Sequence, residues 1–248
     1  MNFYAKTDTG RARTSNQDYV FASDTTIGAL PNLFLIADGM GGHNAGEYAS
    51  EHAIKIVLNK IRTSQEKEPV SVLKQAITAA NEEIYVTSLE EMDKNGMGTT
   101  IVAANIDEGQ LNVANVGDSR LYLISEQSIR QITRDHSVVE ELVRRGALSE
   151  EDASHHKDKH KITRAVGAEK EIRVDFFDVT LTGDEIILMC TNKLTNMVEN
   201  QKILEILSSK ESLKQRVETL VAVANENGGR DNISVLVIEP FSDEVKVC

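Results

Sequence analysis

Four aspartates of this 248-residue chain are placed where their carboxylates could act together, because each ends an apolar segment or lies close to glycine: Asp18, Asp38, Asp118 and Asp231. Carboxylates that are brought together repel one another unless cations lie between them or their pKa values rise. A site made of oxygen ligands suits Mg²⁺ or Mn²⁺. Two such ions activate water and neutralise a phosphoryl group. The residues therefore favour a two-metal phosphoester hydrolase, with turn formation by each lone aspartate as the alternative.

Residues 34–43 (FLIADGMGGH) present one of these carboxylates on almost bare backbone. The apolar run 34–37 predicts a buried strand, and Asp38 is followed by glycines at positions 39, 41 and 42. Glycine lets a ligand approach the backbone closely. A hard divalent cation held by carboxylate and carbonyl oxygens fits this segment, and so does a β-turn capped by Asp38.

An arginine lies close to the first aspartate in the polar loop 9–18. Arg13 comes five residues before Asp18, so an anion-binding group and a cation-binding group can flank one site. Arginine is the residue suited to bidentate contact with phosphate. A solvated surface charge is the alternative for a single loop arginine.

Composition excludes several functional classes. The net charge of −12 and the pI of about 5.0 argue against broad nucleic-acid binding, which needs a basic surface. No apolar run approaches about 18 residues, so we expect no membrane span. Residues 1–6 show neither the basic segment nor the apolar core of a secretory signal, so we expect no such signal. The two cysteines, Cys190 and Cys248, lie far apart, so we expect a reduced, cytoplasmic protein, and we expect a monomer.

The pattern of apolar residues predicts the elements that must position the site. Helical spacing indicates helices over residues 45–61, 70–89, 135–146, 201–207 and 213–224. Alternating or short apolar runs indicate strands over residues 2–8, 19–22, 34–37, 99–106, 110–116, 120–124, 128–132, 172–181, 185–190 and 233–238. Strands at both ends with helix pairs between them favour one domain over residues 1–248, with packed sheets inside and helices outside.

The polar stretch 149–161 is predicted to be a mobile surface flap. It contains His155, His156 and His160 among several lysines. Three nearby histidines suggest a metal site, but their spacing and the interleaved lysines favour a solvated loop.

Seven short motifs resemble those of one enzyme family. They are residues 16–18 (NQD), 38–43 (DGMGGH), 98–100 (GTT), 116–120 (VGDSR), 133–137 (TRDHS), 162–167 (ITRAVG) and 231–235 (DNISV). In this order they resemble the bacterial PPM/PP2C family of metal-dependent serine/threonine protein phosphatases. The resemblance implies an α+β fold, a four-layer α-β-β-α sandwich. Its central antiparallel β-sandwich would be flanked by helix pairs, with a flap at about 147–161.

The resemblance also implies two Mn²⁺ or Mg²⁺ ions and a weaker third. Asp38 would bridge the two ions, and the carbonyl of Gly39 with the carboxylates of Asp18 and Asp231 would help to hold them. Asp118 would serve the third ion. A water between the ions would be the nucleophile, so no covalent phosphoenzyme is expected.

The family further implies what the enzyme acts on. Asp38 and Arg13 would be the catalytic residues, and Arg13 would grip the substrate phosphate. The substrates would be phosphoserine and phosphothreonine in phosphoproteins made by a serine/threonine kinase. Met40 stands where many eukaryotic relatives have a histidine proposed as general acid, and His43 is not equivalent to it.

The chain departs from the family at residues 191–194 (TNKL), where Ser/Thr-Asp-Gly-Leu is usual. Asn192 takes the place of a metal-binding aspartate and keeps only a carbonyl oxygen. Lys193 adds a positive charge, and it would be strained if the usual glycine has φ > 0. Our hypothesis is weaker metal binding with reduced or absent activity. A neighbouring group or a shifted metal could compensate, and a catalytically weak member that binds phosphoproteins or a partner is the alternative function.

Overall fold

The computed structural model describes residues 1–42 and 44–242. His43 and Cys248, both considered above, lie outside the described residues. None of the described helices is long and apolar enough to cross a membrane.

The first sheet joins the two ends of the chain. It contains β1 (Asn2–Asp8), β7 (Arg120–Ser125), β8 (Ser128–Gln131), β10 (Ile186–Cys190) and β11 (Ile233–Glu239), in the order β1-β11-β10-β7-β8 and antiparallel throughout. Strand β11, which lies between β1 and β10, is an almost unbroken apolar run because both of its faces are covered.

The second sheet carries the glycine-rich turn. It contains β2 (Asp18–Ser23), β3 (Leu33–Met40), β5 (Ile101–Asp107), β6 (Gln110–Val116) and β9 (Asp175–Thr180), in the order β2-β3-β5-β6-β9, and the short β4 (Gly98–Thr99) pairs with the end of β3. In the antiparallel pairing of β2 with β3, Asp18 lies opposite Asp38. The register therefore brings two of the predicted carboxylates to one end of the sandwich.

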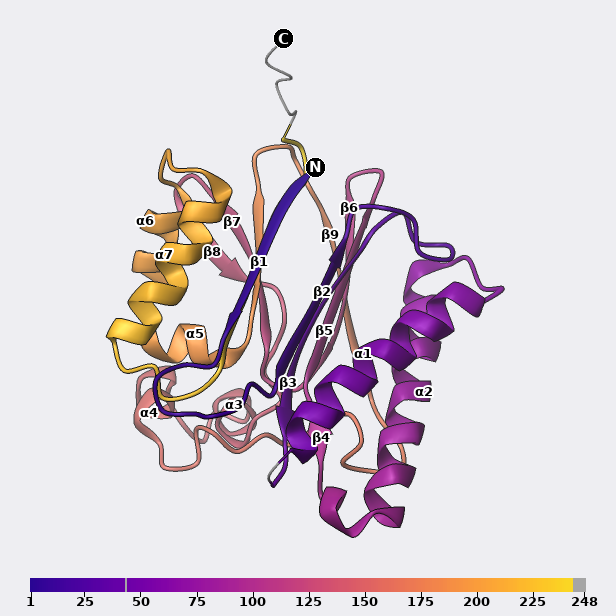
Figure 1. Cartoon of the computed structure of the whole chain (residues 1–248). Coiled ribbons are helices and arrows are strands. Elements are labelled where there is room, and N and C mark those ends of the chain that lie inside the picture. Colours follow the sequence, from indigo (N-terminus) through magenta and orange to yellow (C-terminus); the bar gives the residue numbers. More distant parts are fainter. Residues whose placement is uncertain (43, 243–248) are drawn as a thin grey trace.

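Helices cover the outer faces of both sheets (Figure 1). α1 (Ala45–Thr63) and α2 (Pro69–Glu90) pack on the second sheet. α5 (Asn192–Met197), α6 (Asn200–Leu207) and α7 (Leu213–Glu226) pack on the first sheet. The 3₁₀ turn η1 (Met92–Lys94) follows α2, and α3 (Val138–Arg144) and α4 (Glu150–His155) lie near the lower end of the sandwich. This layered α-β-β-α arrangement confirms the predicted fold class, with α5 added to one of the predicted helix pairs.

Side chains alternate between the layers as strand geometry requires. Phe34 and Ile36 of β3 point into the core between the sheets, where they meet residues of β7, β10 and β11. Leu35 and Ala37 point the other way, against α1 and α2. Each sheet thus has two buried faces, and polar groups gather at the ends of the strands.

Local signals set several helix ends. Pro69 begins α2, and the carboxylate of Glu68 accepts hydrogen bonds from the backbone N–H groups of Val70 and Ser71. Ser212 and Gln215 form a reciprocal capping box at the start of α7. These ends lie within two residues of the predicted ones.

Four predicted elements differ from the structure. The helix expected over 135–146 is shortened to α3 because Ser137 caps it. The strand expected over 99–106 divides at Thr100 into β4 and β5, and the strand expected from 172 begins only at Asp175. Within the flap segment, Ser149 caps the short helix α4, so this part is not simply a loop.

Candidate active site

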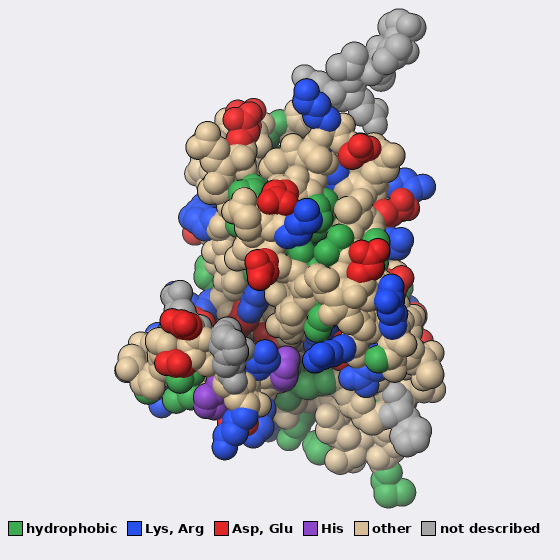
Figure 2. Space-filling model, turned by 90° about the vertical axis from the view of Figure 1, so that its left-hand side faces the viewer, with side chains coloured by type: hydrophobic (Ala, Val, Ile, Leu, Met, Phe, Trp, Pro, Cys, Tyr) green, Lys and Arg blue, Asp and Glu red, His purple; other side chains and the backbone are tan. Residues whose placement is uncertain are grey.

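A pocket of about 490 Å³ lies beside α5 and the ends of β3 and β11. Four residues predicted for the metal site line it: Asp38, Asp118, Asn192 and Asp231. Lys159 of the flap, Lys193 and Arg230 add cationic groups to the lining, and His160 of the flap adds an imidazole. Figure 2 shows Lys, Arg and His side chains gathered over the lower half of one face of the molecule. The pocket therefore combines buried and partly buried carboxylates with basic side chains.

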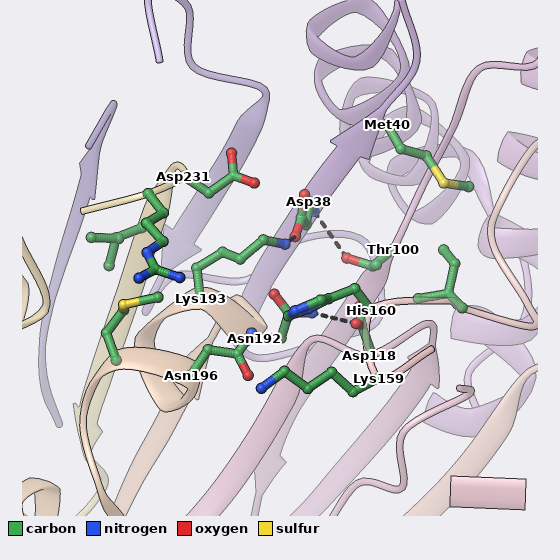
Figure 3. Close-up of a pocket in the computed structure, with 14 residues that line it drawn as sticks. Asp38, Met40, Thr100, Asp118, Lys159, His160, Asn192, Lys193, Asn196 and Asp231 are labelled. Atoms are coloured by element: carbon green, nitrogen blue, oxygen red, sulfur yellow. Dashed lines mark hydrogen bonds and ion pairs between the residues drawn. The ribbon is translucent and has the colours of Figure 1, made fainter. Parts of the chain in front are cut away.

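Asp38 is fixed by hydrogen bonds through its backbone and by an ion pair through its side chain. Its N–H donates to Thr100 Oγ1 at 2.9 Å, and its carbonyl accepts from the Thr100 N–H at 2.9 Å. Lys193 Nζ lies 3.1 Å from Asp38 Oδ2 (Figure 3). The carboxylate predicted to bridge two metals is thus already paired with an ammonium group.

Asp18 lies behind Asp38 and is buried. Its Oδ2 accepts hydrogen bonds from Thr191 Oγ1 at 3.0 Å and from Ser234 Oγ at 2.7 Å, while no described group donates to its Oδ1. Burial, together with the negative charge of Asp38, raises the pKa of Asp18 well above its usual range, against the opposing effects of Ser234, Lys193 and Thr191. A buried oxygen without a donor is one that a cation could satisfy.

Asp118 follows Gly117 in the turn after β6. Asn192 Nδ2 donates a hydrogen bond to Asp118 Oδ2, and Asn192 Oδ1 is buried without a partner among the described residues (Figure 3). Burial raises the pKa of Asp118 to about 6, although the nearby Lys193 lowers it. Asn192 therefore acts here as a hydrogen-bond donor to one of the acids.

Arg13 pairs with an acid of the site. Its Nε lies 2.9 Å from Asp231 Oδ1 and its second nitrogen donates to Asp231 Oδ2 at 3.0 Å. The Arg13 side chain is 55% exposed and lies outside the lining of the pocket, whereas its partner Asp231 belongs to the lining. Arg13, the predicted phosphate-binding residue, is close to the acids. Its guanidinium N–H groups are directed at the carboxylate of Asp231.

Gly39 lies where backbones approach one another most closely. A Cβ atom at this position would meet the Gly46 carbonyl oxygen at 1.9 Å and the Gln17 carbonyl oxygen at 2.7 Å. We therefore expect Gly39→Ala to lower the free energy of unfolding by about 1–3 kcal/mol through overpacking. Gly42→Ala is the matched control, because its Cβ would meet no atom of the described residues within 4 Å. Urea denaturation of both variants measures the difference, and equal stability would contradict the steric argument.

A histidine that sequence reasoning did not single out positions the turn of Asp118. The Gly117 N–H donates to His136 Nδ1 at 2.9 Å, so the neutral ring carries its proton on Nε2, which lies 3.2 Å from Asp175 Oδ2. Arg164 also donates to this carboxylate, at 2.8 Å. Burial lowers the pKa of His136, despite the opposing effect of Asp175.

This depressed pKa predicts acid sensitivity of the fold. A histidine in the unfolded chain binds its proton at about pH 6.5. In the folded protein, His136 binds its proton only at a lower pH. The unfolded chain therefore binds the proton first, and the stabilising contribution is full above about pH 6.5 and is lost as pH falls through the folded pKa. We expect His136→Asn, whose amide oxygen can accept from Gly117, to flatten this part of the stability curve. Urea denaturation between about pH 5 and about pH 8 tests this prediction. Parallel curves of unfolding free energy against pH for the unaltered chain and His136→Asn would contradict it.

Lys193 is part of a helix and is not strained. It lies in the first turn of α5, and Glu108 is the only non-glycine among the described residues with positive φ. The strain considered for this position is therefore absent. Burial would lower the pKa of Lys193, but Asp38, Asp118 and Asp231 together raise it above its usual value, so the side chain carries its charge.

The chemistry of the donors fits a divalent cation better than their arrangement does. The carboxylates gather around one pocket, and the unpaired oxygens of Asp18 and Asn192 are suitable ligands. Yet within residues 1–42 and 44–242 no three His, Cys, Asp or Glu residues are arranged to hold a metal ion. The acids instead have protein partners, and Lys193 stands beside Asp38 as a cation.

Two supporting hydroxyls were missed by sequence reasoning. Thr191 and Ser234 hold Asp18, and the Ser234 N–H also donates to Thr191 Oγ1 at 3.1 Å. The signal available was Ser234 itself, a polar residue inside the apolar run 233–238. Buried polar groups of this kind need hydrogen-bond partners.

The layered fold and its acidic pocket define a protein phosphatase of the PPM class. The family model described as Protein phosphatase 2C matches residues 8–144. The serine/threonine phosphatase stp of Listeria monocytogenes is 42% identical over 247 residues, which cover 96% of each chain. The crystal structure of serine/threonine phosphatase Stp1 from Staphylococcus aureus has a TM-score of 0.88 and 31% identity, covering 95% of this chain and 93% of the other.

A further solved structure is informative about metals. It is the catalytic domain of the serine/threonine protein phosphatase PstP in complex with two manganese ions, with a TM-score of 0.82 and 31% identity over 95% of this chain and 96% of the other. The chain described here belongs to the protein phosphatase 2C family. The resemblance deduced from the motifs is thereby confirmed.

Proposed function

We propose that this chain hydrolyses phosphoserine and phosphothreonine in proteins with the help of Mn²⁺ or Mg²⁺, and that Asn192 and Lys193 reduce its activity. The observation that supports the proposal is the gathering of Asp38, Asp118 and Asp231 on one pocket in a member of the protein phosphatase 2C family. The pocket can admit a phosphorylated side chain, and its acids can hold cations that bind phosphate.

Each predicted residue has a role in this proposal. Two ions would be held by Asp18, Asp38, the Gly39 carbonyl and Asp231, with Asn192 as a weakened ligand and Asp118 serving a third ion. Bound ions would supply positive charge against the phosphoryl group and lower the pKa of water. Arg13 would release Asp231 and bind the phosphate instead, since the two N–H groups that contact the carboxylate fit a phosphate equally well. Asp38 and Arg13 are the proposed catalytic residues.

The site can also be read as that of a binding module. In this second candidate function the chain binds phosphoproteins or a partner without turnover. The ion pair between Lys193 and Asp38 favours it, because that ammonium opposes a metal at the same carboxylate.

We further propose that the chain acts as a single phosphatase domain over residues 1–248. It would work as a cytoplasmic monomer on phosphoproteins made by a serine/threonine kinase. The size of the protein in solution, measured by light scattering, tests the monomer.

The deciding experiment is Mn²⁺-dependent hydrolysis of a phosphothreonine peptide. The unaltered chain is compared with Asp38→Asn, which keeps the side-chain shape and removes the charge. We expect a rate that is low but clearly above that of the variant. If the two rates are equal while the peptide still binds, the binding module is correct and hydrolysis is not.

A further inference from the structure

The side chain of Lys193 crosses the pocket to reach the acids. It extends from the first turn of α5, and its Nζ lies 3.1 Å from Asp38 Oδ2 (Figure 3). Asp118 and Asp231, which line the same pocket, act on this ammonium together with Asp38. The group is mostly enclosed, because only 24% of its side chain is exposed. The positive charge of Lys193 therefore attracts three carboxylates at once.

An ammonium group at this position performs part of what a metal ion would do. It is a compact point charge that offsets the repulsion between neighbouring carboxylates. It cannot share the same carboxylate oxygen with a divalent ion at low cost, because like charges repel strongly in a partly buried site. The four-carbon stem of lysine is flexible, so a metal ion can displace the ammonium group from the carboxylate. The ammonium then still competes with the metal ion for that carboxylate.

Asn192 reinforces this arrangement from the neighbouring position. Its amide donates a hydrogen bond to Asp118, so this acid too is satisfied by the protein. The first turn of α5 thus presents a cation to Asp38 and a neutral donor to Asp118. Both contacts come from the two residues that depart from the motif expected at 191–194.

We propose that the Lys193 ammonium is a tethered cation that takes the place of one divalent ion in the carboxylate pocket. The inference rests on the proposed function to the extent that the pocket binds divalent ions, and it deepens that function by assigning one ion's position to a side chain. The unaltered chain would then hold its acids together without metal. It would bind one Mn²⁺ ion fewer than a chain without the ammonium, or bind the last ion about tenfold or more weakly.

Direct measurement of Mn²⁺ binding by calorimetry tests the proposal on the full chain. Lys193→Met keeps a long apolar stem and removes the charge. Lys159→Met is the matched control, because Lys159 lines the same pocket and loses the same charge. Asn192→Asp restores the carboxylate and keeps the ammonium. We expect Lys193→Met to gain one ion or about tenfold in the affinity of the last ion, with clearly smaller changes in both other variants.

A second measurement needs no binding isotherm. Without metal, Lys193→Met should melt at a lower temperature than the unaltered chain, because its acids have lost their cation. Mn²⁺ should then raise the melting temperature of Lys193→Met much more than that of the unaltered chain. Lys193→Gln provides the same comparison if the methionine variant does not fold.

The outcomes separate this inference from the proposed function. Equal Mn²⁺ stoichiometry and affinity in the unaltered chain and Lys193→Met would overturn the tethered cation, whatever the activity. Recovery of the ion in Asn192→Asp but not in Lys193→Met would also overturn it, and would assign the effect to the lost carboxylate. A gain of Mn²⁺ in Lys193→Met without any hydrolysis would support the tethered cation and count against the proposed enzyme.

Discussion

The double change Asn192→Asp with Lys193→Gly should raise Mn²⁺-dependent hydrolysis of a phosphothreonine peptide by about 10–100-fold or more. It restores a carboxylate where Asn192 now donates to Asp118, and it removes the ammonium that pairs with Asp38. Both changes increase the negative charge available to divalent ions in the same pocket. The ratio kcat/KM, compared for the two chains at the same Mn²⁺ concentration below saturation, measures the gain in transition-state stabilisation.

Asp38→Asn, introduced into both the unaltered and the doubly changed chain, is the control for this prediction. It should abolish the gain, because the restored carboxylate would work together with Asp38. Nearly equal rates in the unaltered and doubly changed chains would show that Asn192 and Lys193 are tolerated, and the impairment hypothesis would then be wrong. A gain in activity without a gain in Mn²⁺ affinity would contradict the electrostatic explanation.

Much of the fold follows from apolar periodicity. The strands expected over 2–8 and 110–116 have the bounds of β1 and β6, and the helices expected over 45–61 and 70–89 differ from α1 and α2 by one or two residues at their ends. These elements are long or strictly alternating, and their apolar faces are covered by another layer. Periodicity and burial agree there, so the sequence is sufficient.

The element that carries the departure from the family was not predicted. α5 has six residues, and no side-chain hydrogen bond caps its start, so it offers little periodic or capping signal. Tertiary contacts stabilise it instead, since Leu194 is fully buried and Thr195 accepts a hydrogen bond from Arg120. Such contacts join residues far apart in the chain and cannot be read from local sequence.

The same limit applies to the candidate site. The sequence predicts one metal site with side chains from Asp18, Asp38, Asp118, Asn192 and Asp231, and all of these except Asp18 line the same pocket. Their present partners were not foreseen: the pair of Arg13 with Asp231 spans 218 positions, and that of Lys193 with Asp38 spans 155. A motif records which residues meet, whereas the choice of partner depends on side-chain geometry and on whether a cation is bound.

The largest loss of stability is expected at a salt bridge beneath the site. Arg120 Nε and its second terminal nitrogen donate to Asp135 at 2.7–3.1 Å, and its other terminal nitrogen donates to Tyr122 Oη at 3.1 Å and to Thr195 Oγ1 at 2.9 Å. The side chains of the pair are only 25% and 12% exposed. Asp135→Asn should therefore lower the free energy of unfolding by about 3–5 kcal/mol, because it leaves a largely buried guanidinium without its counter-charge.

Urea denaturation measures this loss, and a surface ion pair provides the control. Lys202 and Glu205 lie 3.0 Å apart on side chains that are 54% and 55% exposed, so Lys202→Met should cost about 0–1 kcal/mol. A similar small loss for Asp135→Asn would show that water reaches Arg120 freely.

Replacing both partners, Arg120→Met with Asp135→Leu, should cost less than the sum of the single changes, since no charge is then left alone. Because Arg120 also holds Thr195 of α5, its loss should disturb the helix that carries Asn192 and Lys193, and Mn²⁺ binding should change together with stability.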